Sequence, residues 1–232
     1  MKKIALMMTA FIAAFAMTAC NESDSDYATD VAYGNVTSTA PVTFMTDDNQ
    51  MLVVADDSVV GNYTPDFGQR ALIYYKRLQT ANGTSSNQIK LFGYYHFSDG
   101  DSEIIVEGED SSYGDVDIDI WRPEGAYYLV HSIKKVIDMA VTFPGTEAGI
   151  KNHTLTLVLD EEDPVDENNL LKLTLAHSTS DTEAEAKETI ATLYTFDLTP
   201  FAFHIEGTDG VTITTPGIKS EKPVSHSFLW GK

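Results

Sequence analysis

The sequence predicts a protein that is built mostly from β-strands and divided into two domains. Short stretches of alternating apolar and polar residues recur along the chain, separated by turn residues, and this pattern is typical of strands. No long stretch has the 3.6-residue periodicity of a helix. Residues 108–114 are acidic and rich in serine and glycine, which marks the boundary between two groups of strands.

The composition is that of a folded, strongly acidic protein. Hydrophobic residues make up 43% and charged residues 22% of the 232 residues, which argues against a disordered chain, collagen and a coiled coil. Thirty-five acidic against fifteen basic residues give a formal net charge of −20 at pH 7. Such a chain repels phosphate groups, so we expect no nucleic-acid partner.

Residues 1–19 have the features of a lipoprotein signal peptide. Lys2 and Lys3 precede an uncharged, mostly apolar stretch at residues 4–19. This stretch is shorter than the roughly 20 apolar residues that a membrane-spanning helix needs. A cleaved signal is therefore favoured over a transmembrane anchor, which stays open as the alternative.

The single cysteine, Cys20, directly follows this stretch. Met17-Thr18-Ala19-Cys20 resembles the lipobox of bacterial lipoproteins, which implies that Cys20 is diacylated and becomes the first residue of the mature protein. Acyl chains anchor a protein firmly because each buried methylene contributes about 0.8 kcal/mol. Plain secretion with an unmodified thiol is the alternative.

Residues 20–29 are expected to form an acidic tether. Glu22, Asp24 and Asp26 resemble the export signal that sends some lipoproteins to the outer surface of Gram-negative cells, although a solvated linker has the same composition. Without residues 1–19 the chain keeps 13 basic and 35 acidic residues, a formal charge of −22. We expect a protein that is lipid-anchored in the outer membrane, on the periplasmic side or at the cell surface.

The first domain is predicted at residues 30–108. Its six expected strands lie at residues 31–38, 42–46, 51–54, 70–78, 89–97 and 103–106. Asp47-Asp48-Asn49 predicts a tight turn, and Asn82-Gly83 a polar hairpin loop.

The second domain is predicted at residues 109–232. Its expected strands lie at residues 116–121, 126–137, 153–160, 170–178, 189–197, 203–206, 211–215 and 225–230. Arg122-Pro123-Glu124-Gly125 suits a type I turn, and Asp209-Gly210 a hairpin. Only residues 181–188 have helical character, and they are too few for a stable isolated helix.

Two strands of the second domain have leucines at alternate positions. Residues 153–160 and 170–178 each place three leucines on one face, which must enter a core. If the acidic loop 161–169 closes these strands symmetrically, the numbers of paired residues sum to 330. His153 then faces His177.

Two facing histidines suggest a metal site. Neutral imidazole suits zinc or copper, but a site needs three or four ligands. His131 is the candidate third ligand, because the turn at Pro123 would place it on the same face as Val116 and Leu129. The alternative is that His153 and His177 lie at the rim of a core and are hydrogen-bonded. We favour this alternative and expect no metal and no cofactor.

Two acidic groups suggest calcium binding at first sight. Asp115, Asp117 and Asp119 line one face of a strand. Neighbouring members of this set are about 7 Å apart, which is too wide for one calcium ion to bind all three at a distance of about 2.4 Å. The loop residues Glu161, Glu162, Asp163, Asp166 and Glu167 lack the Asp-x-Asp spacing and the glycine of a calcium loop. We expect a solvated strand face and a solvated loop.

Enzyme signatures are missing from the sequence. It contains no Gly-x-Ser-x-Gly elbow, Walker loop, His-Glu-x-x-His or Cys-x-x-Cys motif, and the only thiol is assigned to the anchor. We therefore expect no enzymatic activity. A hydrolase or metal-dependent enzyme, formed by Ser, His and Asp side chains that converge in space, is the least favoured hypothesis.

The first domain is rich in aromatic residues. Residues 30–108 contain four basic and ten acidic residues, so the positive groove that accompanies base stacking is missing. Alternation along the strands places Tyr74 and Tyr94 opposite to Tyr75 and Tyr95. One of these sets is predicted to face solvent and to bind protein or sugar.

Motifs along nearly the whole mature chain suggest a family. They are Tyr33-Gly34-Asn35-Val36, Gly68-Gln69-Arg70-Ala71, Trp121, Gly125, Tyr128-Leu129, His153 leading into Leu157-Val158, Leu173-Thr174-Leu175-Ala176-His177 and Phe196-Asp197-Leu198-Thr199-Pro200. In this order they resemble the NigD-like lipoproteins. The chain departs from that family at Ser178, where members often carry asparagine, and in the individual loop 55–67.

The resemblance implies an N-terminal OB-like barrel, a C-terminal antiparallel β-sandwich and a lipid anchor at Cys20. It implies no catalytic residue. We expect a cell-envelope protein that contacts the membrane through its acyl chains and acts by binding a protein or a glycan. The alternative is self-protection against a toxin, because the family is named after a proposed bacteriocin-immunity role.

Overall fold

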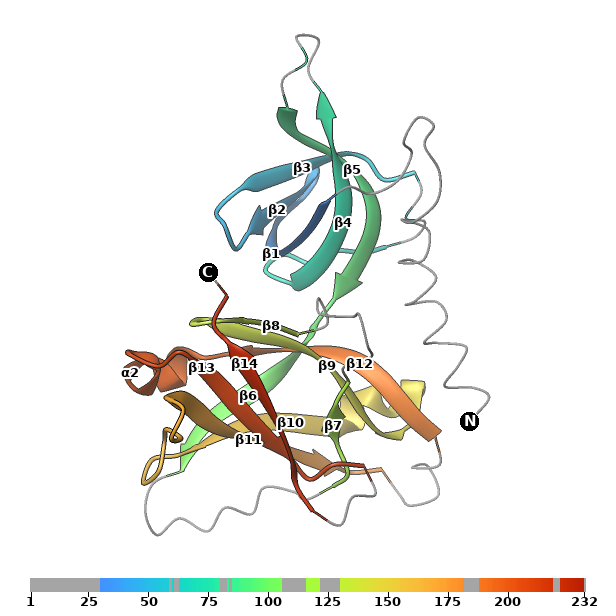
Figure 1. Ribbon diagram of the computed structural model, residues 1–232. Helices are drawn as coiled ribbons and strands as arrows, with labels where there is room; N and C mark the ends of the chain where they lie inside the picture. Colours follow the sequence, from blue (N-terminus) through green and yellow to red (C-terminus); the bar gives the residue numbers. More distant parts are fainter. Residues whose placement is uncertain are drawn as a thin grey trace, which may run out of the picture. The chain divides into compact units, whose positions relative to one another are not determined.

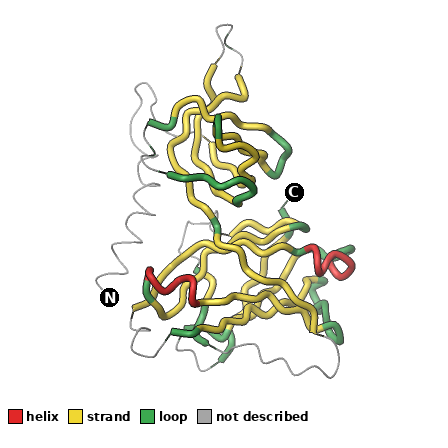
Figure 2. The backbone as a smooth tube through the Cα atoms, turned by 180° about the vertical axis from the view of Figure 1, so that it is seen from behind, coloured by secondary structure: helices red, strands yellow, loops and turns green. Residues whose placement is uncertain are grey.

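The computed structural model describes residues 30–58, 60, 63–79, 83, 85–105, 116–121, 130–181, 188–218 and 222–231. These residues belong to two compact units that divide between Phe97 and Ser98, and almost every described element is a strand (Figures 1 and 2). The all-β prediction is thereby confirmed. The predicted signal peptide, Cys20 and the tether lie outside the described residues.

The first unit is a closed five-stranded barrel (Figure 1). Its strands follow the order β1-β2-β3-β5-β4, and β1 pairs with β4 to close it. Only β3 and β5 run parallel. This is the architecture of an OB-type barrel. The strands are β1 (Asp30–Thr39), β2 (Val42–Thr46), β3 (Met51–Asp56), β4 (Arg70–Gln79) and β5 (Ser85–His96).

Alternate residues of these strands fill the barrel. The inward side chains of Phe44, Leu52, Ile73, Ile89 and Leu91 have no exposed surface. Burying one side chain of this size contributes about 1.5–3 kcal/mol, so a small barrel gains most of its stability from this set.

The tyrosines of β4 and β5 group differently from the prediction. Ile73 pairs with Tyr94, and the pairs of residues 71–74 join an odd to an even number, before the register shifts between Tyr74 and Tyr75. Tyr75 and Tyr94 therefore share the core side, while Tyr74 and Tyr95 share the other side with their rings edge to face at 5.7 Å. Tyr74 and Tyr75 are buried and the other two are half-buried, so the expectation of one solvent-facing set is wrong.

The second unit contains nine strands that fold into two layers over one core (Figure 1). The order is β14-β13-β11-β10-β6-β12-β9-β7, and β8 pairs with β9. The strands are β6 (Ser98–Ile105), β7 (Asp119–Ile120), β8 (Val130–Ile133), β9 (Val136–Gly145), β10 (His153–Asp160), β11 (Leu170–Thr179), β12 (Glu188–Asp197), β13 (Gly210–Thr215) and β14 (Val224–Leu229).

Strand β6 joins the two layers. Residues 98–100 pair with β12, and residues 101–105 pair with β10. Core side chains come from both layers, for example Phe143 on β9 and Leu157 on β10. The first unit ends at Phe97. The predicted boundary lies later, at residue 108, because the expected strand at 103–106 was grouped with the barrel.

Three strand pairs are parallel, where the sequence analysis expected an antiparallel sandwich. They are β6 with β10, β6 with β12, and β11 with β13. Each pair joins strands that are far apart in the sequence. Local turn signals, which predict hairpins, carry no information about such pairs.

Some elements differ from the predicted strands. The expected strand at 126–137 ends in a hairpin, β8–β9, that turns at Lys134 and Lys135. The expected strand at 203–206 is the short helix α2 (Ala202–Ile205). It follows a 3-10 turn, η3 (Thr199–Phe201), because Pro200 suits the start of a helical turn.

The register of β10 and β11 is shifted by two residues from the prediction. Leu155 pairs with His177, and His153 with Thr179, so the paired numbers sum to 332 and not to 330. The loop folds back on β11, where Lys172 N donates to the carbonyl of Pro164 at 2.8 Å. A shift of two keeps every side chain on its predicted face, and the leucines do enter the core.

Candidate functional site

Two buried imidazoles lie in contact at one end of the β10–β11 pair. His153 is the first residue of β10, and His177 is diagonal to it on β11. His153 Nδ1 lies 2.8 Å from His177 Nε2. Phe143 packs against both rings, with centroid distances of 4.4 and 4.9 Å. His177 has no exposed surface.

Asp181 extends this pair into a chain of hydrogen bonds. Its Oδ2 lies 3.0 Å from His153 Nε2, and its Oδ1 accepts from Asn152 Nδ2 at 2.6 Å. Asn152 ends the 3-10 turn η2 (Glu147–Asn152). A Cβ on Gly149 in this turn would lie 2.8 Å from Asp181 Oδ2, so the glycine leaves the room that the carboxylate occupies.

The partners determine where the protons lie. His177 Nδ1 is 3.1 Å from the carbonyl oxygen of Asp117, which only accepts, so Nδ1 carries a proton. Burial lowers the pKa of His177 to about 4, which keeps the ring neutral and makes its Nε2 an acceptor. His153 Nδ1 therefore donates to it.

His153 Nε2 lies 3.0 Å from Asp181 Oδ2, so both ring nitrogens of His153 have a hydrogen-bond partner. The hydrogen bond from Asn152, followed by the interaction with His153, lowers the pKa of Asp181. We call Asp181, His153 and His177 the histidine relay.

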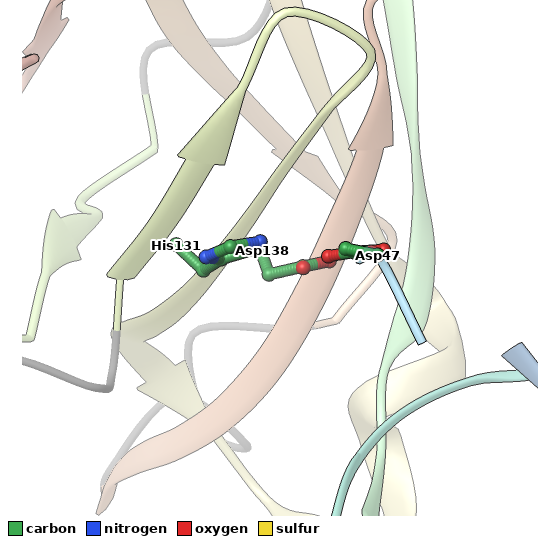
Figure 3. Close-up of side chains that lie close together, drawn as sticks. All are labelled: Asp47, His131 and Asp138. Carbon is green, nitrogen blue, oxygen red and sulfur yellow. The ribbon is translucent and has the colours of Figure 1, made fainter. Parts of the chain in front are cut away.

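All four ring nitrogens of the relay are hydrogen-bonded, which leaves none to bind a metal ion or to abstract a proton from a substrate. The geometry thus favours the hydrogen-bonded alternative over the metal site. His131, the expected third ligand, lies on β8 opposite Asp138 of β9. Figure 3 shows the side chains of His131 and Asp138. In the barrel, Asp47 binds Arg70 through both carboxylate oxygens at 2.6 Å.

Asp119 is not part of a solvated face as expected. Its Oδ1 lies 2.8 Å from His226 Nε2 and accepts from Thr215 Oγ1 at 3.2 Å and from Ile120 N at 2.8 Å. These bonds tie β7 to β13 and β14. Asp117 contributes its carbonyl to the histidine relay, and Asp115 lies outside the described residues.

The acidic loop between β10 and β11 is organised by Asp166. Its Oδ1 accepts from the backbone N–H groups of Asn168 and Leu170 at 2.8 and 3.0 Å, and its Oδ2 accepts from Thr212. The bond from Leu170 N–H is the main reason that the pKa of Asp166 is lowered. Asp163 pairs with Lys172, so these two carboxylates have protein partners.

A row of aromatic rings lies on the barrel, where the loop between β3 and β4 meets the end of β5. Tyr94 is at the centre, with its ring 5.3 Å from that of Tyr63 and 6.5 Å from that of His96. Tyr63 and Tyr94 are half-buried and His96 is exposed. We call Tyr63, Tyr94 and His96 the aromatic row.

Both phenols of the aromatic row are held by hydrogen bonds. Tyr63 Oη donates to Asp57 Oδ2 at 3.1 Å, and Tyr94 Oη donates to Gln69 Oε1. Burial raises the pKa of Tyr94 to about 12, so its phenol stays neutral. The exposed side chain of Phe67 lies in the same loop.

Sequence reasoning found the two histidines of the relay and Tyr94 of the aromatic row, but it missed Asp181, Asn152, His226 and His96. Asp181 follows β11 at once, and Asn152 precedes His153. Polar residues just beyond strand ends were the signal available for these two.

Comparisons with known proteins give a family for the barrel and a fold for the whole chain. Residues 33–94 match the NigD-like N-terminal OB domain, which confirms the predicted resemblance. Among curated proteins, no sequence matches this chain.

Three solved structures have a similar fold. A protein of unknown function from Bacteroides vulgatus has a TM-score of 0.62 and 13% identity over 87% of this chain and 90% of its own. A protein from Bacteroides fragilis that is described as a lipoprotein has a TM-score of 0.59 and 14% identity, and the match covers 88% of this chain and 98% of that protein. A protein from Parabacteroides distasonis that is described as toxin-related has a TM-score of 0.58 and 16% identity, and the match covers 87% of this chain and 93% of that protein.

Within the described residues, no helix has the length and apolar character needed to cross a membrane.

Proposed function

Because this chain carries a NigD-like N-terminal OB domain, we propose that it is a lipid-anchored protein of the cell envelope that acts by binding a protein or a glycan. The observation that carries the proposal is the aromatic row of the barrel. It offers partly exposed rings whose hydroxyl groups are already fixed, and a pre-organised surface loses little conformational entropy when it binds.

The anchor is supported by the sequence. Residues 4–19 are uncharged and end in the lipobox-like Met17-Thr18-Ala19-Cys20, and one structural neighbour is described as a lipoprotein. The acidic residues 22, 24 and 26 support a place at the outer membrane, on the periplasmic side or at the cell surface.

Binding without catalysis is supported by the histidine relay. An acid–base catalyst needs a ring nitrogen within reach of a substrate proton. The relay uses its four ring nitrogens for internal hydrogen bonds, so its role is to stabilise the sandwich.

Two experiments test the proposal. Mass spectrometry of the membrane fraction is expected to find a diacylated Cys20, and Cys20→Ser to release the protein from membranes. Crosslinking on intact cells, followed by purification of the full-length chain, is expected to recover a protein or glycan that Tyr63→Ala no longer captures. An unmodified thiol contradicts the anchor, and capture that Tyr63→Ala leaves unchanged contradicts the binding surface.

Self-protection against a toxin is the second candidate. It is favoured by the NigD-like domain and by a structural neighbour that is described as toxin-related. Cells that lack the gene are then expected to become sensitive to a toxin encoded beside it. Unchanged sensitivity rules this candidate out and leaves the first proposal standing.

A further inference from the structure

We infer that the aromatic row of the barrel binds an uncharged oligosaccharide. This inference rests on the proposed function and names the partner of the same surface. It is carried by the combination of three neighbouring rings with hydrogen-bond acceptors at their edge.

The rings supply the stacking surface. The centroids of Tyr63 and Tyr94 are 5.3 Å apart, and His96 continues the row beyond Tyr94. The ring planes of Tyr63 and Tyr94 are inclined at 46°, and those of Tyr94 and His96 at 35°. The two tyrosines rest on the barrel core with part of each ring exposed, and the C–H faces of sugars pack on aromatic faces. Because the phenols are tied to Asp57 and Gln69, the rings keep one orientation, which lowers the entropic cost of binding.

The polar groups suit hydroxyl donors. The exposed carboxylate of Asp57 has lone pairs beyond the one that Tyr63 uses, and a carboxylate accepts up to about four hydrogen bonds. The ring nitrogens of the exposed His96 make no hydrogen bond with any residue in the described part of the chain. Asp57 can therefore accept hydrogen bonds from sugar hydroxyls, and His96 can both donate and accept them.

The charges exclude phosphate-bearing and acidic ligands. Asp57 and Asp66 are exposed in the loop that carries Tyr63, and they repel anions. Three of the barrel's four basic residues have partners elsewhere: Arg70 with Asp47, Arg77 with the Gln50 side chain, and Lys90 with Asp56. The aromatic row itself contains rings and acceptors but no lysine or arginine, which fits a neutral ligand and disfavours nucleic acid.

The test is binding of the full-length lipidated chain, in detergent, to an array of uncharged oligosaccharides of glucose, mannose, galactose and xylose. An array of sulfated and uronic-acid oligosaccharides serves for comparison. We expect binding on the first array only, followed by affinity measurement with the strongest binder. Tyr63→Ala removes one stacking ring and is expected to weaken binding about tenfold.

Matched variants separate stacking from folding. Tyr63→Phe keeps the ring and is expected to keep most of the affinity, whereas His96→Ala, at an exposed position, is expected to weaken binding without loss of thermal stability. Phe203→Ala removes an aromatic side chain that is 88% exposed in the other unit and is expected to change nothing.

The outcomes distinguish the inference from the proposed function. Binding to the acidic array alone overturns the inference, as does loss of affinity in Phe203→Ala equal to that in Tyr63→Ala. If the chain binds neither array but crosslinks to a protein that the Tyr63→Ala variant does not capture, the inferred oligosaccharide ligand is wrong and the proposed binding function stands. Failure on both arrays without any crosslinked partner overturns both.

Discussion

The barrel and the sandwich use their polar side chains in opposite ways. Residues 30–97 contain four basic and six acidic residues, a formal charge of −2, whereas residues 98–232 contain nine basic and 26 acidic residues, a formal charge of −17. The nearly neutral barrel exposes His96 beside two fixed tyrosines. The acidic sandwich buries His153 and His177 and bonds each of their ring nitrogens.

This difference separates two roles for the same residue type. A histidine whose nitrogens are all bonded inside a core contributes to stability, and one at an exposed edge is available to a ligand. The predictions below test whether the two units divide these roles as the structure indicates. Both tryptophans, Trp121 and Trp230, belong to the sandwich, so tryptophan fluorescence follows its unfolding separately.

The largest effect is expected for His177→Ala. The change leaves a cavity and deprives the buried Nδ1 of His153 of its hydrogen-bond partner, and the two losses together cost about 3–5 kcal/mol. Urea unfolding followed by tryptophan fluorescence measures this loss. The exposed counterpart His96→Ala is expected to change the free energy of unfolding by less than about 0.5 kcal/mol. Equal effects of the two variants would contradict the division of roles.

Acid is expected to destabilise the sandwich next most strongly. The pKa of His177 is about 4 in the folded state, below its ordinary value of 6.5, so the unfolded chain binds the proton more tightly. The stabilisation is fully present above pH 6.5 and falls as the pH drops from 6.5 to about 4, by up to about 3 kcal/mol. The lowered pKa of Asp181 adds a loss in the same direction at lower pH.

Urea midpoints at several pH values measure this dependence, and a variant without the imidazole, His177→Asn, is the control. We expect its stability to vary less between pH 4 and 6.5 than that of the unchanged chain. Parallel slopes in both proteins would show that His177 is not the group that titrates.

A smaller loss is expected for Asp119→Ala. It removes the acceptor of Thr215 and Ile120 N–H and the partner of His226. Because this site is partly exposed, water replaces some of these bonds, and we expect a loss of about 1–2 kcal/mol. Asp99→Ala, at an exposed position of the same unit, is the control and is expected to have little effect on thermal unfolding.

The smallest effect is expected for Tyr94→Phe in the barrel. The ring stays on Phe44, and only the bond to Gln69 is lost, which costs about 0.5–1.5 kcal/mol. Six of the eleven tyrosines lie in residues 30–97, so the part of the near-ultraviolet circular dichroism change that does not coincide with the tryptophan fluorescence change follows the unfolding of the barrel. A larger loss, equal to that of His177→Ala, would mean that the row is a core element and not a binding surface.

Period-two alternation predicted most strands well. The bounds of β2 and β10 agree with the prediction to the residue, because apolar residues recur there at alternate positions and turn residues flank both strands. The strand β9 was missed beyond Ile137, although Ile137, Met139, Val141 and Phe143 recur at alternate positions and enter the core. The predicted strand 126–137 instead runs through the turn at Lys134 and Lys135, where the chain reverses.

The candidate sites were predicted only in part. Alternation placed His153 and His177 on one face of the sheet. This placement is correct although the predicted register is wrong, because a shift of two residues leaves every side chain on the same face. The error itself came from the assumption of a symmetric loop, whereas Pro164 in that loop pairs back on Lys172. Asp181 and Asn152 meet only because the turn η2 folds over the strand ends, and no local pattern encodes that contact.

Strand β6 has a consequence for how the chain is made. It is synthesised directly after the barrel, but its two neighbours, β10 and β12, follow about fifty and ninety residues later. Until then both of its edges are open to other chains, and pairing over such separations slows folding. Asp99, Asp101 and Glu103 recur along one exposed side of it, and such charges on a strand oppose pairing with other chains before the late strands are made.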